Sequence, residues 1–462
     1  MTPEAWVSPD DIRASFSRAM SEMYKAEVPQ YGTLCELVAQ SNRRVLERDA
    51  GAAGRPGQDG PSRLAVERHG AIRLGTPEEL VMMRRLFGVM GMRAVGYYDL
   101  SAAGLPVHAT SFRPIDDEAL ERNPFRVFTS LLRLDLIRDG DLRRCAEQAL
   151  ARRDIFTPGC RESVSLAERQ GGLNGPQARQ FVAQALETFR WHREAAVDVQ
   201  TYERLRAVHP LVADIVCFKG PHINHLTPRV LDIDDVQARM ASAGLHAKKE
   251  IEGPPPRAVP ILLRQTSFAA LAEPVRFAGA SGQSHHTARF GEVEQRGAAL
   301  TRKGRARYDA RLADARSRSK SGVPLAEAMA QAFTDFPDDV ASLHREGLAF
   351  FRYRLDRERL DAGAPPRGLA PDQLLAGGWL TLEPLVYEDF LPVSAAGIFR
   401  SNLGGESGVP ALEAGGRALF ERLLQDGVLD EIELYEKTQQ AALDACLRQL
   451  ENCHPKNPET YQ

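Results

Sequence analysis

The chain has 462 residues, of which 43% are hydrophobic and 26% are charged, and its formal net charge is −3 at pH 7. These values are ordinary for a globular enzyme, and the slightly acidic balance argues against a general nucleic-acid-binding protein. At about 150 residues per domain, the length predicts two or three structural units, with a core large enough to fold without disulfides.

The cysteines and the hydropathy of the chain predict where it works. The six cysteines form no CxxC pair and show no regular spacing, which is typical of reduced thiols in a cytosolic protein. No apolar run approaches the roughly 18 residues that cross a bilayer, and the N-terminus lacks the apolar stretch of a signal peptide. We therefore expect a cytoplasmic protein without a membrane partner. No motif indicates its oligomeric state.

Hydrophobic periodicity divides the chain into helical and strand-like stretches. Apolar residues at helical spacing predict helices within 10–48, and a Gly/Pro loop follows at 51–62. A strand, a helix and a second strand are expected between 63 and 101. Residues 116–215 are predicted to be mostly helical. Short strands and one helix alternate between 223 and 300, and the remaining C-terminal part is expected to mix helices with loops.

Two strand–helix–strand stretches, 69–99 and 225–252, resemble each other. In each, a histidine early in a strand is followed four residues later by an arginine: His69 and Arg73 in the first, His225 and Arg229 in the second. An acidic helix start and a glycine at the helix end follow in both. We favour an internal repeat over coincidence, because the histidine and the arginine recur in register.

These residues can be assembled into a metal site. A strand points residues i, i+2 and i+4 to one side, so His69 shares a face with Arg73. If the two similar units pair, their histidines can point into one cavity, and the stretch FGEVEQRG offers Glu292 or Glu294 as a third ligand. Two imidazoles and one carboxylate make the facial triad of non-haem Fe(II) oxygenases. A neighbouring arginine can bind a substrate carboxylate through two hydrogen bonds.

Each candidate also has an ordinary structural role open to it. His69 could lie at the start of a strand without binding a ligand, the glutamates could lie on a solvated strand edge, and the arginines could form ion pairs only. His222 competes with His225, but it follows Gly-Pro in a predicted turn, which makes it less suited to point inward. Of His285 and His286, at most one can face the site, because adjacent strand residues point in opposite directions; we interpret this pair as lying behind the site or gating it.

Four stretches of the sequence resemble the 2-oxoadipate dioxygenase/decarboxylase family, also called 2-hydroxyglutarate synthase. They are RHGAIRLGT (68–76), KGPHINHLTPRVLDID (219–234), RFGEVEQRGAALTRKGRARYD (289–309) and EDFLPVSAAGIFRSNLG (388–404). The resemblance extends from about residue 10 to beyond residue 400. The family belongs to the vicinal oxygen chelate superfamily. This implies an α+β fold in which paired βαβββ units form a curved mixed sheet around a metal cavity, with extra helical segments.

The resemblance and the predicted elements together suggest five segments. They are an N-terminal helical segment (1–62), a first vicinal-oxygen-chelate-like unit (63–115), a helical insertion (116–215), a second such unit that carries metal ligands (216–300), and a C-terminal helical and loop region that completes the substrate pocket (301–462). The helical insertion has no chemistry that the sequence can assign.

The resemblance also implies roles for single residues. FGEVEQRG is similar to the last metal-bearing strand of 4-hydroxyphenylpyruvate dioxygenase, Phe-x-Glu-Val-x-Gln-Arg, in which the first glutamate binds iron. This selects Glu292 over Glu294. The family resemblance likewise implies metal ligation by His69 and His225, and a clamp on the substrate carboxylate by Arg73. Backbone N–H groups of Val393 and Ser394, in the loop LPVSAAG, are expected to hold a carboxylate as well.

The implied activity is the Fe(II)-dependent conversion of 2-oxoadipate and O2 to 2-hydroxyglutarate and CO2, in lysine catabolism through 2-aminoadipate. One alternative is a non-oxidative enzyme of the same superfamily that uses Zn, Mn or Ni on another 2-oxo acid. A second is a non-catalytic protein that binds RNA or a partner through the basic stretch 302–322. Aspartates are interleaved there and no aromatics are spaced to stack bases, so we expect no nucleic-acid partner.

Overall fold

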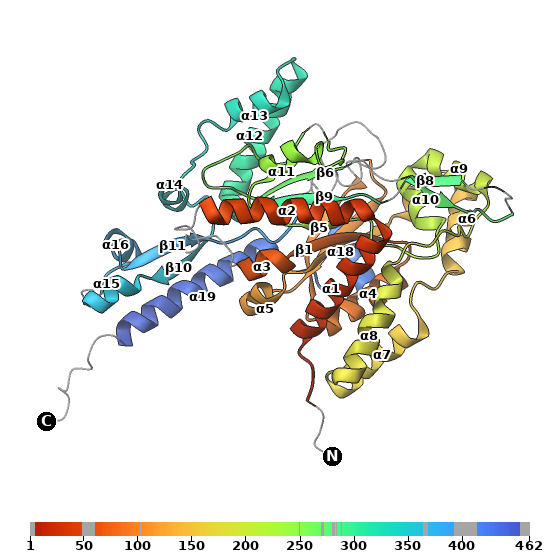
Figure 1. Cartoon of the computed structure of the whole chain (residues 1–462), viewed down its shortest axis with the longest axis horizontal. Helices are drawn as coiled ribbons and strands as arrows, with labels where there is room; N and C mark the ends of the chain where they lie inside the picture. Colours follow the sequence, from red (N-terminus) through yellow and green to blue (C-terminus); the bar gives the residue numbers. More distant parts are fainter. Residues whose placement is uncertain are drawn as a thin grey trace.

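The computed structural model of the protein is a mixed α+β structure in which helices surround a set of strands (Figure 1). It describes residues 5–48, 61–101, 104–248, 250–268, 272–279, 282, 284–287, 289–363, 368–391 and 414–452. A helical hairpin stands out from the body at the top of Figure 1; it consists of α12 (Arg302–Lys320) and α13 (Leu325–Ala332).

The largest sheet has five strands in the order β2-β3-β4-β1-β5. Their bounds are β1 (Arg68–Leu74), β2 (Arg93–Asp99), β3 (Val107–Arg113), β4 (Arg126–Leu132) and β5 (Leu226–Pro228). β1 and β4 are parallel, whereas the other neighbours are antiparallel. Because α4 (Pro77–Val89) connects β1 to β2, the order β1-α4-β2-β3-β4 makes one βαβββ unit.

Local sequence signals set the limits of α4. The side chain of Thr76 accepts a hydrogen bond from the backbone N–H of Glu79 at 3.2 Å, and Pro77 occupies the first turn. Both are favoured at the start of a helix. Gly91 ends this region with a φ of 68°, and Gly244 has the same role after α11 (Ile233–Met240), with a φ of 76°. The left-handed conformation favours glycine at both positions.

A second unit begins at β5 and continues through α11 to β9. Its strands are β6 (Leu263–Ser267), β7 (Ala272–Val275), β8 (Ser284–Thr287) and β9 (Glu292–Arg296). β6 is antiparallel to β9, and β7 to β8. Just beyond β5, Arg229 forms a parallel bridge with Glu294, and the N–H of Val230 donates to the carbonyl of Glu294 at 2.7 Å. The first strand therefore runs parallel to the last, as β1 does to β4.

The two units meet along their first strands. β1 and β5 are antiparallel, with His69 opposite Thr227 and Gly70 opposite Leu226. The strand sequence β4-β1-β5-β9-β6 consequently passes from one unit into the other. The predicted α+β fold of paired βαβββ units with extra helices is confirmed.

Successive residues of β1 point to opposite sides of the strand, and each side packs into a different hydrophobic core. Ile72 belongs to the core formed with α1 (Pro9–Glu27), α2 (Pro29–Arg48), α4, α7 (Pro158–Gln170), α8 (Gly175–Leu186), α11 and α18 (Ala414–Leu424). Ala71 belongs to the core formed with α6 (Gly140–Ala151), α9 (Val199–Val208), α10 (Pro210–Val216), α12, α13, α14 (Val340–Arg345) and α19 (Glu431–Asn452). His69 and Arg73 share the face of Ala71, because strand residues alternate.

Four parts of the fold differ from the sequence prediction. The strand expected to end the stretch 225–252 is absent from the described residues, which form only isolated bridges there, at Ala247 and Glu252. Residues 126–132, predicted to be helical within the segment 116–215, form β4 at the centre of the sheet. Their apolar residues are spaced as on a helix face, and a short run of this kind is decided by its tertiary partners. The helix α3 (Pro61–Val66) precedes β1, where only a strand was expected. The C-terminal region contains the strand pair β10 (Phe351–Leu355) and β11 (Leu380–Pro384), beside α15 (Arg357–Ala362) and α16 (Pro371–Ala376).

The remaining short helix, α5 (Asp117–Arg122), leads into β4.

Among the described residues, no helix combines the length and the apolar character needed to cross a membrane.

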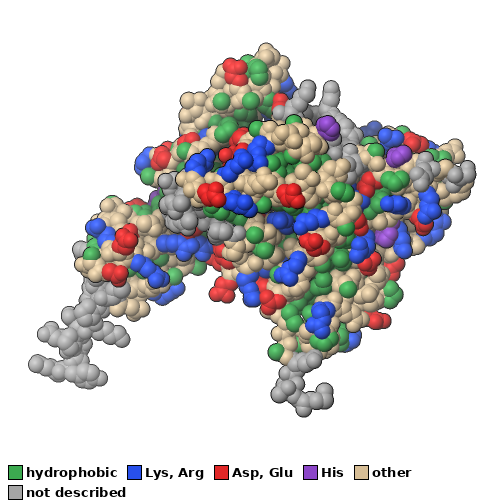
Figure 2. Space-filling model, viewed as in Figure 1, with side chains coloured by type: hydrophobic (Ala, Val, Ile, Leu, Met, Phe, Trp, Pro, Cys, Tyr) green, Lys and Arg blue, Asp and Glu red, His purple; other side chains and the backbone are tan. Residues whose placement is uncertain are grey.

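The basic stretch 302–322 forms α12, whose arginines have acidic neighbours. Arg305 and Arg318 pair with aspartates one turn along the helix, and Arg311 pairs with Asp335. On the face shown in Figure 2, acidic and basic side chains are interspersed. The charge of this helix is thus largely compensated within the protein, which argues against the alternative of a nucleic-acid-binding helix.

Candidate metal centre

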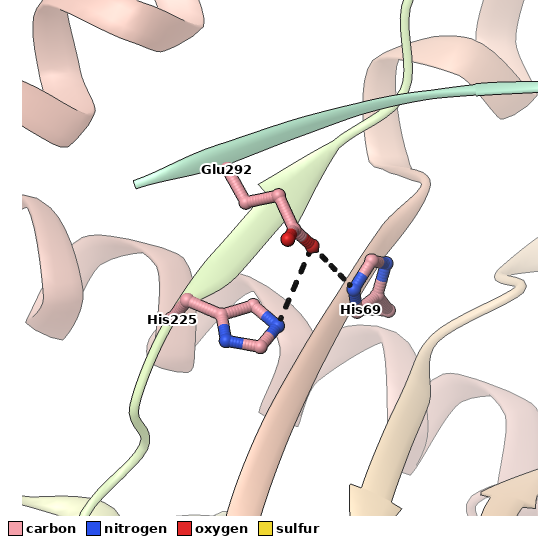
Figure 3. A group of neighbouring side chains, drawn as sticks. All are labelled: His69, His225 and Glu292. Atoms are coloured by element: carbon pink, nitrogen blue, oxygen red, sulfur yellow. Dashed lines mark ion pairs between the residues drawn. The ribbon is translucent and has the colours of Figure 1, made fainter. Parts of the chain in front are cut away.

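Three buried side chains from neighbouring strands converge on one point (Figure 3). His69 lies on β1, His225 immediately precedes β5, and Glu292 begins β9. One nitrogen of each imidazole and one oxygen of the carboxylate lie within 4.8 Å of one another. Nε2 of His69 is 3.2 Å from Oε1 of Glu292, and Nε2 of His225 is 3.7 Å from the same oxygen. The structure therefore brings together the three residues that the sequence predicted as ligands.

A glycine beside His69 lets the two histidine-bearing segments approach. A Cβ atom at Gly70 would lie 2.9 Å from the carbonyl oxygen of His225 and 2.6 Å from Cδ1 of Ile223. The first of these contacts is with backbone, which cannot move aside as a flexible side chain can. Glycine is thus needed where β1 meets the chain entering β5.

The electrostatics favour a neutral imidazole and an ionised carboxylate. Burial lowers the pKa of His225 to about 3, so this ring is neutral at physiological pH. Burial alone would raise the pKa of Glu292, but its interactions with the His225 and His69 rings lower it below the ordinary value. For His69, burial opposes protonation, but Glu294 and Glu292 raise its pKa overall. Binding of a cation at Nε2 would require that nitrogen to be deprotonated.

The donor set fits a divalent transition metal. Both ring nitrogens of His225 are buried, and neither has a hydrogen-bond partner among the described residues. Folded proteins rarely leave buried polar atoms in that state, and a bound ion would satisfy Nε2, the nitrogen that faces Glu292. Two imidazoles and one carboxylate leave one side of a six-coordinate metal open. The geometry and the unsatisfied nitrogens therefore both indicate a metal at this point.

Polar and aromatic neighbours fix the three side chains. Oε1 of Glu292 accepts hydrogen bonds from Oγ1 of Thr227 at 3.1 Å and from Nε2 of Gln265 at 2.9 Å. The ring of Phe390 lies 5.0 Å from that of His69, and the ring of Phe290 lies 4.7 Å from that of His225. The centre therefore has an apolar wall on two sides. Thr227 is two residues from His225 on the same strand face, so the sequence could have suggested its proximity.

Glu294, the alternative ligand, also contacts His69, but from the other side of the ring. Its Oε2 lies 3.0 Å from Nδ1 of His69, whereas Glu292 faces Nε2. Glu292 and Glu294 thus lie on one face of β9, as predicted, and reach opposite nitrogens of one imidazole. Only Glu292 belongs to the converging group.

Arg73 lies near the centre and pairs with an acid that the sequence did not suggest. Its Nη1 donates to the carboxylate of Asp214, on α10, and its charge contributes, after burial, to the lowered pKa of His225. Asp214 is buried, and the charge of Arg73 holds the pKa of this carboxyl far below its ordinary value although burial opposes ionisation. The sequence signal was a single acid in the apolar run PLVADIVCF. Segment 116–215, which had no predicted chemistry, thus contributes to the site.

Two other histidines, His222 and His286, lie close to the carboxylate of Asp214. Nε2 of His286 lies 2.9 Å from Oδ1 of Asp214, and Nδ1 of the same ring lies 2.9 Å from the hydroxyl of Tyr202. Nε2 of His222 lies 3.6 Å from that aspartate oxygen. His222 is only 2% exposed, so the expectation that it would not point inward was wrong. His285 is exposed and His286 is buried, as alternation along a strand requires.

The predictions for Arg229, Val393 and Ser394 have different outcomes. Nη1 of Arg229 donates to Oε2 of Glu67 at 2.9 Å, so this arginine takes part in an ion pair, the simpler of the two roles expected for it. Val393 and Ser394 lie outside the described residues, and their expected contacts with a carboxylate stay a prediction.

Comparison with known proteins identifies the family to which this chain belongs. A sequence model of the family described as 2-oxoadipate dioxygenase/decarboxylase matches residues 16–402. The 2-oxoadipate dioxygenase/decarboxylase of Escherichia coli (strain K12) is 53% identical over 442 residues, which cover 95% of this chain and 98% of that protein. The enzyme of the same name from Pseudomonas putida is 50% identical over 461 residues, covering 97% and 99%.

A solved structure agrees with the sequence comparisons. The crystal structure of hydroxyglutarate synthase from Pseudomonas putida, in complex with 2-oxoadipate, matches with a TM-score of 0.89 at 50% identity, covering 96% of this chain and 99% of that one. The resemblance inferred from four sequence stretches is confirmed. The chain is an enzyme that belongs to the 2-oxoadipate dioxygenase/decarboxylase family.

Proposed function

We propose that this enzyme converts 2-oxoadipate and O2 to 2-hydroxyglutarate and CO2, with Fe(II) held by His69, His225 and Glu292. The observation that carries the proposal is the buried convergence of two imidazoles and one carboxylate within 4.8 Å, in a chain whose relatives are named for this reaction. The family resemblance also supports lysine catabolism as the metabolic setting.

The proposed reaction balances without a second organic substrate. The bond between C1 and C2 of 2-oxoadipate breaks, and C1 leaves as CO2. The former keto carbon becomes a carboxylate and its neighbour gains a hydroxyl, so both atoms of O2 end in 2-hydroxyglutarate. Bound Fe(II) would supply the activation of O2 and a chelating site for the 2-oxo acid group.

The residues of this chain would position and shield the substrate. His69, His225 and Glu292 would hold the proposed metal, and a three-residue ligand set would leave room for substrate and O2 to bind it. Arg73, on the strand face of His69, would bind the distal carboxylate, with the backbone N–H groups of Val393 and Ser394 as further proposed donors. The aromatic rings beside the two histidines exclude water from the reacting groups.

An oxygen-uptake assay tests the reaction. Purified protein is stripped of metal, reconstituted anaerobically with Fe(II), and mixed with 2-oxoadipate in aerated buffer while O2, CO2 and the organic product are followed together. We expect equal amounts of O2 consumed, CO2 released and 2-hydroxyglutarate formed, and no turnover of the metal-free protein. If O2 is consumed with another 2-oxo acid but not with 2-oxoadipate, that other acid would be the substrate. No uptake with any 2-oxo acid, despite bound metal, would favour the non-oxidative alternative.

Replacing Arg73 with methionine is expected to weaken the binding of 2-oxoadipate by ~10–100-fold, because hydrogen bonds to charged groups contribute about 1.5–3 kcal/mol each. 2-Oxohexanoate lacks the distal carboxylate, so its binding should change little. The measurement is the dissociation constant of both compounds under anaerobic conditions. Arg85→Met, which removes an exposed arginine paired with Glu168, serves as the control. Equal losses for both compounds would contradict the assigned role of Arg73.

A further inference from the structure

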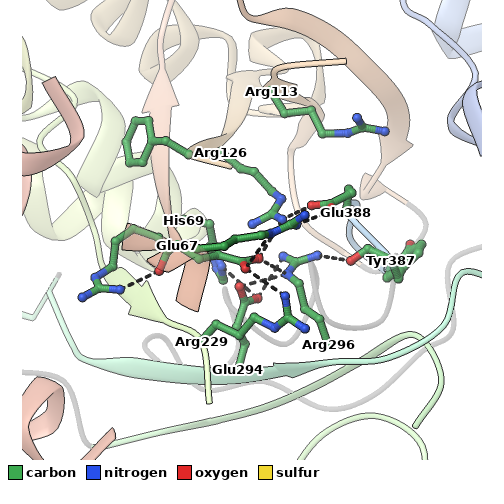
Figure 4. A network of polar contacts seen from close by, with 12 residues as sticks. Glu67, His69, Arg113, Arg126, Arg229, Glu294, Arg296, Tyr387 and Glu388 are labelled. Atoms are coloured by element: carbon green, nitrogen blue, oxygen red, sulfur yellow. Dashed lines mark hydrogen bonds and ion pairs between the residues drawn. The ribbon is translucent and has the colours of Figure 1, made fainter. Parts of the chain in front are cut away.

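Glu294 lies directly behind one of the proposed ligands. Its Oε2 is 3.0 Å from Nδ1 of His69 (Figure 4). Nε2 of the same ring faces the converging group shown in Figure 3. A neutral imidazole carries one proton, so a ring that binds a metal through Nε2 must carry its proton on Nδ1. Glu294 is fully buried, and its Oε2 lies within hydrogen-bond distance of that nitrogen, although the two atoms are not aligned as a hydrogen bond in this structure.

The carboxylate of Glu294 is held in place from its far side. Nε of Arg296 donates to Oε1 at 2.9 Å, and Nη2 of Arg296 lies 2.9 Å from Oε2. Arg296 is itself anchored, since its Nη1 donates to the carbonyls of Tyr387 at 2.7 Å and Asp389 at 3.0 Å. The backbone carbonyl of Glu294 accepts from Val230 at 2.7 Å. Both the side chain and the backbone of this residue are therefore fixed before a metal binds.

Glu294 is also ionised. Burial opposes ionisation, but both oxygens of the carboxylate lie 2.9 Å from nitrogens of Arg296, a permanently charged guanidinium. The group is consequently a carboxylate at physiological pH. An ionised acceptor forms a shorter and stronger hydrogen bond than a neutral one, and it increases the electron density of the imidazole that donates to it.

The two histidines differ in this respect. Among the described residues, neither Nδ1 of His69 nor Nδ1 of His225 makes an aligned hydrogen bond. Nδ1 of His69, however, lies 3.0 Å from a carboxylate oxygen of Glu294, whereas among these residues His225 contacts a carboxylate only through Nε2. His69 faces Glu292 with one nitrogen and Glu294 with the other. The centre thus pairs one histidine supported by a carboxylate with one that is supported only by packing, including the Phe290 ring.

We propose that Glu294 is a positioning residue of the metal centre: it accepts the Nδ1 proton of His69, fixes the tautomer and orientation of that ring, and strengthens its bond to the metal through Nε2. The inference rests on the proposed function only in taking His69 as a ligand.

The test measures metal affinity without turnover. We expect Glu294→Gln to bind Co(II) ~10–100-fold more weakly than the wild type in competition with a chromophoric chelator, the typical cost of losing a residue that orients a ligand from behind. The visible absorption of the bound Co(II) should shift, because the donor strength of one imidazole changes. An affinity and a spectrum equal to those of the wild type would overturn the proposal.

A matched variant separates positioning from folding. Glu388 is also buried and pairs with Arg126 and Arg63 in the same group of arginines, but it has no contact with His69 in the network of Figure 4. Glu388→Gln should lower stability while leaving Co(II) affinity unchanged. If Glu388→Gln weakens Co(II) binding as much as Glu294→Gln does, loss of stability alone accounts for both and the proposal fails.

A measurement on the wild type covers the case in which Glu294→Gln does not fold. In Zn(II)-loaded protein with 15N-labelled histidine, NMR should show His69 protonated at Nδ1 and metal-bound at Nε2. Metal bound through Nδ1 would overturn the proposal. Neither measurement needs substrate, so failure of the proposed reaction in the oxygen assay would be seen separately.

Discussion

Glu292→Ala is expected to abolish metal binding and turnover together, with losses larger than the ~10–100-fold predicted for a residue that only supports a ligand. The variant removes the sole carboxylate of the converging group and leaves His69 and His225. Glu294 cannot replace it, because it contacts the opposite nitrogen of His69. Iron content after anaerobic reconstitution and O2 consumption with 2-oxoadipate measure the two effects.

Glu383→Ala supplies the comparison for this variant. Glu383 is a strand glutamate on β11 that pairs with Arg354, so its loss tests whether removing any strand carboxylate has the same effect. We expect normal iron content and normal turnover. A Glu292→Ala enzyme that keeps full iron and full activity, while Glu294→Ala is inactive, would transfer the ligand role to Glu294.

Glu67→Gln is expected to lower the free energy of unfolding by about 3–5 kcal/mol, because it leaves buried arginines without a compensating charge. Glu67 is fully buried between α3 and β1. It accepts hydrogen bonds from Nη2 of Arg126 at 2.8 Å and from Nη1 of Arg229 at 2.9 Å. Figure 4 shows these side chains around one point behind the metal centre. Chemical denaturation monitored by circular dichroism measures the change.

The same variant changes the response to acid. Burial alone would raise the pKa of Glu67, but Arg229 and Arg63 are the first of several arginines that hold it well below the ordinary value of 4.5. Stability from this carboxylate is therefore present above pH 4.5 and is lost as the pH falls below it. The wild type should lose stability more steeply than Glu67→Gln in that acidic range.

An exposed ion pair provides the reference for Glu67. Glu346 pairs with Arg307 at 2.7 Å on the surface, where both side chains are partly exposed. Glu346→Gln should change the free energy of unfolding by less than about 1 kcal/mol, since exposed pairs contribute little. If Glu67→Gln also lowers the free energy of unfolding by less than about 1 kcal/mol, the buried arginines must find other partners when the carboxylate is removed.

The sequence predicted the ligands because they follow a strand pattern. His69 and His225 each precede an arginine by four residues, and that register pointed to two related units whose histidines meet. The choice between Glu292 and Glu294 could not be made from the pattern, because both residues lie on one face of β9 and both contact His69. It depended on the family resemblance and then on which nitrogen each carboxylate faces.

The features that were missed depend on tertiary contacts. Strand β4 has apolar residues at a spacing that suits a helix, and only its pairing with β1 and β3 makes it a strand. Asp214 and Glu67 are acids whose burial is possible because arginines distant in the chain reach them. No local pattern encodes those partners, so the environment of Arg73 and the arginine group behind His69 could not be derived from the sequence.

The seam between β1 and β5 makes the proposed metal site depend on both units of the fold. The first unit supplies one donor, His69, whereas the second supplies His225 and Glu292. Neither half holds a complete set, so under the proposed function the metal would bind only after both halves have folded and docked in register.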